Sequence, residues 1–131
     1  MERTSQFSVT LENKPGRLAH VCRSLAERSI NIIALSVAET TEQGILRLVV
    51  DKPKEAASAL KQCELPFTQM QVLLVELPNK VGVAALLAEK LSAKRVNISF
   101  VYGSTGKGRG KTFVVVGASN LKAAEKLLTK L

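Results

Sequence analysis

The stretch "VTLENKPGRLA" at residues 9–19 returns in altered form as "VELPNKVGVAA" at residues 75–85. A valine, a leucine, an Asn-Lys pair and a glycine occupy the same places in both stretches. In each, an alternating run is broken by a turn with glycine, and apolar residues then recur at helical spacing. The same change from strand to helix is therefore predicted twice in one chain.

The correspondence continues beyond these stretches at one fixed offset of 66 residues. Asn31-Ile32 aligns with Asn97-Ile98, and Val49-Val50 aligns with Val115-Val116. A one-residue shift before the last helix brings the ends into register. Because a long sequence period indicates repeated structural units, the chain divides into two predicted repeats. Their bounds are 1–66 and 67–131.

Each repeat follows the order strand, helix, strand, strand, helix. The first repeat has expected strands at 7–11, 31–39 and 45–50, with helical spacing over 18–26 and 53–60. The second has expected strands at 72–77, 97–103 and 111–117, with helices at 82–94 and 120–130. Helices on one face of an antiparallel sheet make an α+β sandwich of the ferredoxin-like βαββαβ kind. We expect two such repeats, packed with pseudo-two-fold symmetry.

The βαββαβ order requires a fourth strand in each repeat. Residues 67–77 form one long strand pattern, which ends the first repeat and begins the second. The second repeat stops at Leu131 with no strand left. Since residues 1–6 are equivalent to 67–72, we expect them to extend the first strand and complete the sheet of repeat two.

The composition is that of a globular protein, with 46% hydrophobic and 23% charged residues. It holds no apolar run long enough to span a membrane and no signal-peptide core. Cys22, Cys63 and His20 are too few for a disulfide framework or a zinc site, so we expect no metal and a reducing, cytoplasmic setting. The net charge of +8 lies almost wholly in the second repeat.

The basic stretch "GSTGKGRGKT" at residues 103–112 looks like the end of a nucleotide-binding P-loop. Its spacing is wrong, because Thr105 stands where the motif requires its first glycine. A strand pattern also follows the stretch, whereas phosphate binding requires a helix N-terminus. We therefore interpret it as a basic hairpin tip between two strands.

The motif Asn13-Lys14-Pro15-Gly16-x-Leu18, followed by a helix and then "INII", resembles the ACT domain, a small ligand-sensing βαββαβ module. The whole chain resembles a tandem pair of ACT domains. The second copy, Asn79-Lys80-Val81-Gly82-Val83, lacks the proline and the leucine. The resemblance implies an amino acid or similar carboxylate bound at the interface between paired domains, without a cofactor. It also implies a regulated enzyme and a second copy of the chain as partners.

The residue types at these turns suit such a ligand. Gly16 and Gly82 leave backbone N–H groups accessible where a helix begins, and a helix N-terminus attracts a carboxylate. An asparagine amide accepts from an ammonium group and donates to a carboxylate. The candidate ligand-binding residues are Asn13, Pro15, Gly16, Arg17, Leu18, Asn31 and Ile32 in repeat one, and Asn79, Gly82, Val83, Asn97 and Ile98 in repeat two. Turn and capping chemistry alone also selects asparagine and glycine, so a purely structural role stays open.

Two other function classes are less well supported. Enzyme catalysis lacks a recognisable nucleophile–base pair or a pair of carboxylates, so we expect a non-catalytic protein. Nucleic-acid binding is the alternative, because the RNA-recognition fold shares the βαββαβ order and the second repeat is basic. That fold uses aromatics on its two central strands, whereas residues 45–50 have none and residues 112–116 have only Phe113.

Overall fold

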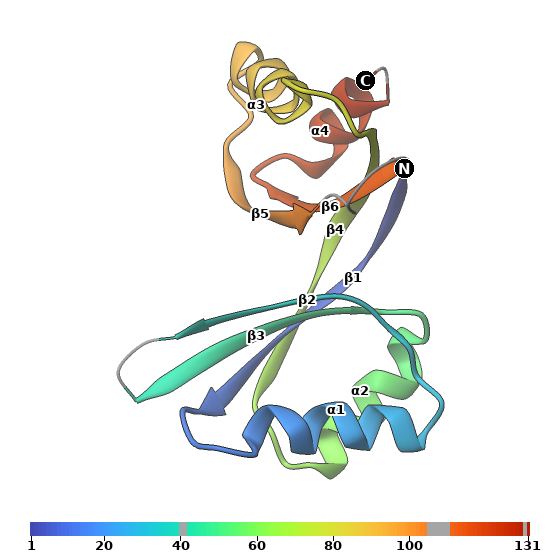
Figure 1. Cartoon of the computed structure of the whole chain (residues 1–131), viewed down its shortest axis with the longest axis vertical. Coiled ribbons are helices and arrows are strands. Elements are labelled where there is room, and N and C mark those ends of the chain that lie inside the picture. Colours follow the sequence, from blue (N-terminus) through green and yellow to red (C-terminus); the bar gives the residue numbers. More distant parts are fainter. Residues whose placement is uncertain (40–41, 105–110, 130) are drawn as a thin grey trace. The chain divides into compact units, whose positions relative to one another are not determined.

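The computed structural model describes residues 1–39, 42–104, 111–129 and 131 (Figure 1). The strand and helix order βαββα occurs twice, which confirms the predicted α+β class. The elements are β1 Glu2–Glu12, α1 Arg17–Glu27, β2 Ile32–Glu39, β3 Gln43–Val50, α2 Pro53–Gln62, β4 Phe67–Pro78, α3 Val83–Ala93, β5 Ile98–Ser104, β6 Lys111–Ala118 and α4 Leu121–Leu128. Among the described residues, no helix is long and apolar enough to cross a membrane.

The strands are hydrogen-bonded in the order β2-β3-β1-β4-β6-β5. Contacts divide the chain into two compact units, one of Ser5–Met70 and one of Met1–Thr4 with Gln71–Leu131. β1 and β4 therefore each supply residues to both units. For this reason the units do not coincide with the sequence repeats, which divide the chain after residue 66.

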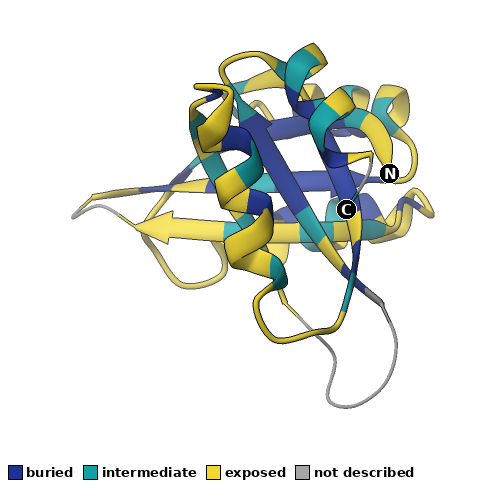
Figure 2. Ribbon diagram, turned by 90° about the horizontal axis from the view of Figure 1, so that it is seen from above, coloured by how far each residue is buried: buried dark blue, intermediate teal, exposed yellow. Residues whose placement is uncertain are grey.

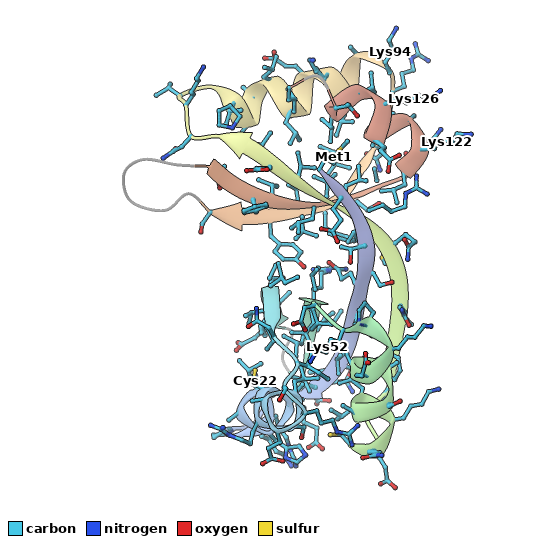
Figure 3. The ribbon with its side chains drawn as sticks, turned by 90° about the vertical axis from the view of Figure 1, so that its right-hand side faces the viewer. Met1, Cys22, Lys52, Lys94, Lys122 and Lys126 are labelled. Atoms are coloured by element: carbon cyan, nitrogen blue, oxygen red, sulfur yellow. The ribbon has the colours of Figure 1, made fainter. Side chains whose placement is uncertain are left out.

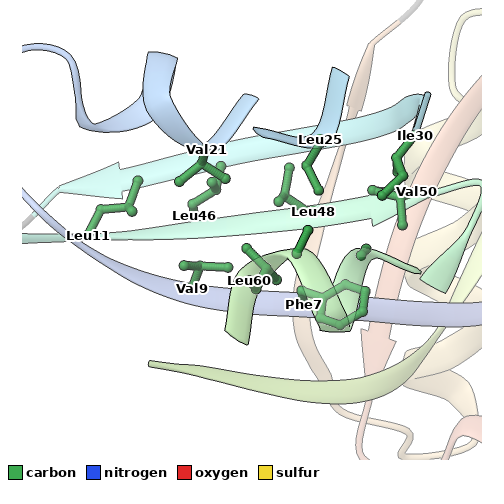
Figure 4. Packing of buried hydrophobic residues seen from close by; sticks show 12 residues of the cluster. Phe7, Val9, Leu11, Val21, Leu25, Ile30, Leu46, Leu48, Val50 and Leu60 are labelled. Atoms are coloured by element: carbon green, nitrogen blue, oxygen red, sulfur yellow. The ribbon is translucent and has the colours of Figure 1, made fainter. Parts of the chain in front are cut away.

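The unit Ser5–Met70 buries the apolar face of its sheet under α1 and α2. β3 pairs antiparallel with both β1 and β2, and Phe7 and Val9 of β1 lie opposite Leu48 and Leu46 of β3. Their neighbours along the strands point to the opposite face of the sheet, because successive residues of a strand alternate. Gln6 and Val49 are buried on that face. Val21 and Leu25 of α1, with Ala56, Ala59 and Leu60 of α2, close the same core (Figure 4).

The second unit, Met1–Thr4 with Gln71–Leu131, is built in the same way. β6 pairs antiparallel with β4 and β5. Alternate β4 residues, Leu73, Val75 and Leu77, pack with Leu87 and Leu91 of α3. Ala124 and Leu128 of α4 complete this core. Figure 2 shows buried residues along several strands and exposed residues on the outer sides of the helices, whereas β2 and β5 contain no buried residue.

The structure adds a register shift that the sequence pattern did not predict. It lies between Ile32 and Ala34 in β2, and between Ile98 and Phe100 in β5. An extra residue in one strand shifts which face the following side chains point to, so the two-residue alternation expected from the sequence is interrupted there. The predicted strand after the basic hairpin is confirmed, since β6 begins at Lys111. Residues 105–110 of that hairpin lie outside the described residues.

Removal of residues 1–4 is expected to destabilise the second unit more than the first. These residues are part of that unit, and Arg3 Nε lies 3.2 Å from Glu125 Oε2 of α4. Without them, β4 loses part of its neighbouring strand β1, so amide exchange in the β4 residues of this unit should accelerate. Arg3→Ala is the matched control, because an exposed ion pair contributes only about 0–1 kcal/mol. Unchanged exchange in the truncated chain would show that residues 1–4 contribute nothing to that sheet.

Candidate functional site

The two helices that follow the Asn-Lys-x-Gly turns begin in the same unusual backbone conformation. Gly16 precedes α1 with φ 88° and ψ −10°, and Gly82 precedes α3 with φ 89° and ψ −3°. A Cβ built on either glycine meets no atom within 4 Å, so a side chain would have room at both positions. Glycine is favoured there by the left-handed φ, which is unfavourable for residues with a side chain. The predicted turn chemistry is thus present in both repeats.

The first turns of α1 and α3 have no side-chain hydrogen bond from their N-cap residues. Neither helix carries an acidic residue in that turn. α4 differs, since Oδ1 of Asn120 accepts from the Ala123 N–H at 3.0 Å. The first N–H groups of a helix have no partner within the helix and attract negative charge. The α1 and α3 ends therefore keep this capacity for an external carboxylate.

The same backbone hydrogen bonds shape the two turns. Lys14 N–H donates to the Glu12 carbonyl at 2.9 Å, and Arg17 N–H donates to the Lys14 carbonyl at 3.3 Å. In repeat two, Lys80 N–H donates to the Pro78 carbonyl at 3.0 Å. Val83 N–H there donates to the Lys80 carbonyl at 3.3 Å. The turn therefore forms without Pro15, whose place is taken by valine in repeat two.

The charges around the two turns differ. Glu12 lies 3.1 Å from Lys14 Nζ and 3.7 Å from Arg17 Nη2. The hydrogen bond and positive charge of Lys14, with the charge of Arg17, lower the pKa of the exposed Glu12 carboxyl below its usual value. At the equivalent positions of repeat two, Pro78 and Val83 replace Glu12 and Arg17. The ion pairs of Glu12 therefore have no counterpart at the same positions of repeat two.

The predicted asparagines do not gather within one repeat. Asn13 lies before α1 and Asn31 lies after it, so the 11 residues of that helix separate them by about 16 Å. The Asn31 N–H donates to Oδ1 of Asp51 at 2.9 Å, and the Asn97 N–H donates to Oγ of Ser119 at 3.0 Å. These bonds hold the starts of β2 and β5.

The predicted apolar lining residues have different surroundings. Ile32, Val83 and Ile98 are partly buried and pack against the cores of their own units. Leu18 keeps 37% of its surface exposed, although it is the apolar residue that opens the helical pattern. Leu18 is therefore the one of these four that offers an apolar surface to a ligand beside the Gly16 turn.

Predicted site residues line two of the cavities among the described residues. One, of about 450 Å³, is lined by Ala88, Ser92, Arg95, Val96, Asn97 and Ile98. The other, of about 310 Å³, holds Arg17 together with residues that sequence reasoning missed. The missed residues are Thr10, Glu12, His20, Gln43, Cys63, Glu64, Leu65 and Pro66, with the core residues Leu11 and Val21. No sequence signal connects these positions, because they come from four separate segments.

The basic character of the second repeat is visible on its helices. Figure 3 shows Lys94, the residue after α3, projecting outward, and Lys122 and Lys126 of α4 doing the same. Lys94 and Lys126 also line a cavity of about 310 Å³ between α3 and α4. The rings of Phe100 and Tyr102 lie 6.4 Å apart on β5, away from these helices. The Phe100–Tyr102 pair thus lies on a strand, whereas these three lysines lie on α4 or at the end of α3.

Comparisons with known proteins agree on the fold. The family model for an ACT domain pair matches residues 3–130. Protein BT0572 from Bacteroides thetaiotaomicron has a similar structure, with a TM-score of 0.90 and 34% identity over 98% of this chain and 88% of that one. The regulatory subunit of aspartate kinase from Thermus thermophilus is more distant, with a TM-score of 0.69 and 19% identity over 99% and 93%. The corresponding subunit from Thermus flavus has a TM-score of 0.65 and 19% identity over 99% and 92%. No curated protein gives a match.

Proposed function

Since the chain belongs to the family of ACT domain pairs, we propose that it is a non-catalytic regulatory protein that senses an amino acid or a similar small carboxylate. The observation that supports this proposal is the recurrence of a glycine-capped helix N-terminus in both repeats. Such an end provides several N–H donors and a favourable dipole for one carboxylate. The absence of acidic residues from both first turns preserves that preference.

The ligand would contact the turns Asn13–Leu18 and Asn79–Val83. Asn13 and Asn79 are exposed beside the glycines and have amide groups suited to an amino acid. Asn31 and Asn97 lie beyond the far ends of α1 and α3, so they could join a turn only from a facing domain. The two turns differ in charge, and we therefore expect unequal affinities.

The partner that such a sensor would control is an enzyme. The structures from Thermus thermophilus and Thermus flavus are regulatory subunits of aspartate kinase, which is a precedent for a separate regulatory chain. Association with a second copy of the chain is the other expected interaction. The two cysteines are free thiols, which is consistent with the cytoplasmic setting that we propose.

A thermal-shift screen against the twenty amino acids tests this function. A ligand at 100 times its Kd should stabilise the folded chain by about 2.7 kcal/mol. Gly16→Val should remove the part of the shift that depends on the first turn, because a β-branched residue disfavours φ 88° and its side chain obstructs the N–H groups. Gly82→Val tests the second turn in the same way. A screen in which no amino acid raises the melting temperature would contradict the proposal.

Nucleic-acid binding gives the opposite pattern in the same experiment. It would depend on the basic residues Lys107, Arg109 and Lys111, and its affinity would fall steeply with salt. Lys107 and Arg109 lie outside the described residues, so the structure does not place them. The triple change of these residues to alanine is therefore the control for the amino-acid screen, where we expect no effect.

A further inference from the structure

The outer surface of α3 is more apolar than that of the helix it repeats. Leu86 keeps 43% of its surface exposed, and Ala93 is exposed as well. At an offset of 66 residues, α1 has the exposed residues His20 and Glu27 in these places. Because a surface helix ordinarily turns charged or polar residues to water, this side of α3 carries an apolar surface that its own unit leaves exposed.

The helix pair of the first repeat is bridged where α1 and α2 end. Arg28 Nη2 donates a hydrogen bond to Oε1 of Gln62, the last residue of α2. The Cys63 thiol, one residue further on, donates to Oγ of Ser24 at 3.4 Å. Side chains of α1 and of the end of α2 therefore bridge the two helices at this place.

The corresponding place between α3 and α4 holds a cavity of about 310 Å³, which we call the α3–α4 groove. It lies wholly within the unit that contains both helices. Its lining residues are Lys90, Ala93, Lys94, Lys126 and Leu127. At the offset of 66, Lys90 and Lys94 take the places of the bridging residues Ser24 and Arg28. The second helix pair therefore has a basic groove where the first has a polar bridge.

The floor of the α3–α4 groove is apolar and its border is basic. Ala93 and Leu127 supply the apolar surface, and Leu127 also packs against the core of the unit. Lys94 and Lys126 are exposed and project outward (Figure 3). A lysine stem lies along apolar surface while its ammonium group stays in water. An occupant of the groove thus meets apolar surface at the centre and positive charge around it.

Acidic side chains do little to offset this charge. Glu125 of α4 is engaged by Arg3, whose Nε lies 3.2 Å from Oε2 of the glutamate. Glu89 is exposed on α3 and is not among the residues that line the groove. The exposed Lys122 and Arg95 add further positive charge on α4 and after α3. The surface around the groove therefore attracts negatively charged partners.

The combination of floor and border favours one kind of anionic partner. A small-molecule site fixes its ligand with precisely placed polar groups, whereas lysine carries its charge on a flexible four-carbon stem. Nucleic acids stack bases on aromatic or arginine side chains, and the five described residues that line the groove include neither. A membrane surface is too broad to fill a narrow recess. An apolar side chain flanked by carboxylates fills the recess and pairs with the lysines.

From these observations we infer that the α3–α4 groove is a docking site for an acidic amphipathic helix of another protein. A helix of this kind lays its apolar face into a groove between two helices. Its apolar side chains cover Leu86, Ala93 and Leu127. Carboxylates on its flanks meet Lys94 and Lys126. The docking site is independent of the proposed amino-acid site, since the groove includes no residue of the Asn-Lys-x-Gly turns.

Binding of synthetic peptides to the full chain tests the docking site. The probe is a peptide of about 16 glutamate and leucine residues, long enough to form a helix in water, with its leucines along one face. The matched peptide has alanine in place of every leucine, which keeps both the charge and the helix propensity. Fluorescence anisotropy of the labelled peptides measures the two affinities. The leucine peptide should bind at least about tenfold more tightly, because it alone fills the apolar floor.

Charge reversal locates the bound peptide. Lys94→Glu together with Lys126→Glu should weaken binding of the leucine peptide by at least about tenfold, because two attractive pairs become repulsive. Lys54→Glu together with Lys61→Glu makes the same change in net charge on the exposed side of α2. This control pair should leave the affinity nearly unchanged at physiological salt, which screens charges that lie far from the peptide.

A neutral substitution tests the floor of the groove. Ala93→Gln places a longer side chain in the groove without changing the charge, and it should weaken the leucine peptide by about fivefold. Ala85→Gln is the matched control, because Ala85 is exposed on the same helix and does not line the groove. Melting temperatures of all variants establish beforehand that each one is folded.

The possible results separate the docking site from its rivals and from the proposed function. Equal affinities of the two peptides, or equal losses from the two charge-reversal pairs, would overturn the docking site. Oligothymidine or phosphatidylserine vesicles that bind through Lys94 and Lys126, while the leucine peptide does not bind, would assign the surface to nucleic acid or to membrane instead. The thermal shift caused by an amino acid should be the same with and without the charge reversal. The sensing function and the docking site can therefore fail separately.

Discussion

Leu25→Ala is expected to lower the free energy of unfolding by about 2–5 kcal/mol, as removal of a fully buried leucine does in well-packed cores. Leu25 is 0% exposed and lies on the face of α1 that covers β1 and β3. Its replacement leaves a cavity that the paired strands close only in part. Urea unfolding followed by circular dichroism measures the change.

Leu18→Ala is the matched control on the same helix. Leu18 keeps 37% of its surface exposed, so the same truncation should cost well under half as much as at Leu25. Equal losses for the two variants would show that α1 does not pack on the sheet through the face described. Because Leu18 lies beside the Gly16 turn, its variant also reports on ligand binding without unfolding the unit.

Gly103→Ala should destabilise the second unit by about 3 kcal/mol, near the upper end of the cost of overpacking. A Cβ at this position would lie 2.4 Å from the Phe113 carbonyl oxygen and 3.0 Å from Val114 Cα. Both atoms belong to the backbone of β6, so no side-chain rotation relieves the clash. Faster amide exchange in β5 and β6, with a lower melting temperature, is the expected result.

Gly44→Ala provides the comparison for Gly103→Ala in a strand of the other unit. Its Cβ would meet the Ala38 carbonyl oxygen at 3.6 Å and Val37 Cγ1 at 3.7 Å, which are ordinary contacts. The change should be neutral or should stabilise the strand slightly, since alanine restricts the unfolded chain more than glycine does. A Gly103 variant as stable as the Gly44 variant would mean that β5 and β6 are not so closely paired.

Local patterns in the sequence predicted most of the fold. The fixed offset between the repeats predicted two βαββα units, as the structure has them. The predicted last helix was too long, since α4 spans Leu121–Leu128 rather than residues 120–130. Helix ends depend on capping and on packing of the last turn, which periodicity does not report.

The candidate site was predictable only in part. Gly16 and Gly82 were identified because a strand that turns sharply into a helix requires a residue tolerant of positive φ, and both have it. The register shifts near Ile32 and Ile98 escaped prediction, because an extra residue in a strand leaves no mark on composition. The roles proposed for Asn31 and Asn97 stay predictions.

The sequence by itself determined the repeat, the order of strands and helices, and the two glycine turns, because each depends on residues that are neighbours along the chain. The tertiary structure alone decided that Glu64 and Leu65 line one cavity with Glu12 and Arg17. It also decided where the predicted sharing of the first strand ends, since Met1–Thr4, rather than residues 1–6, group with Gln71–Leu131. Such groupings follow from the packing of helices on a sheet, which brings together side chains that no local preference connects.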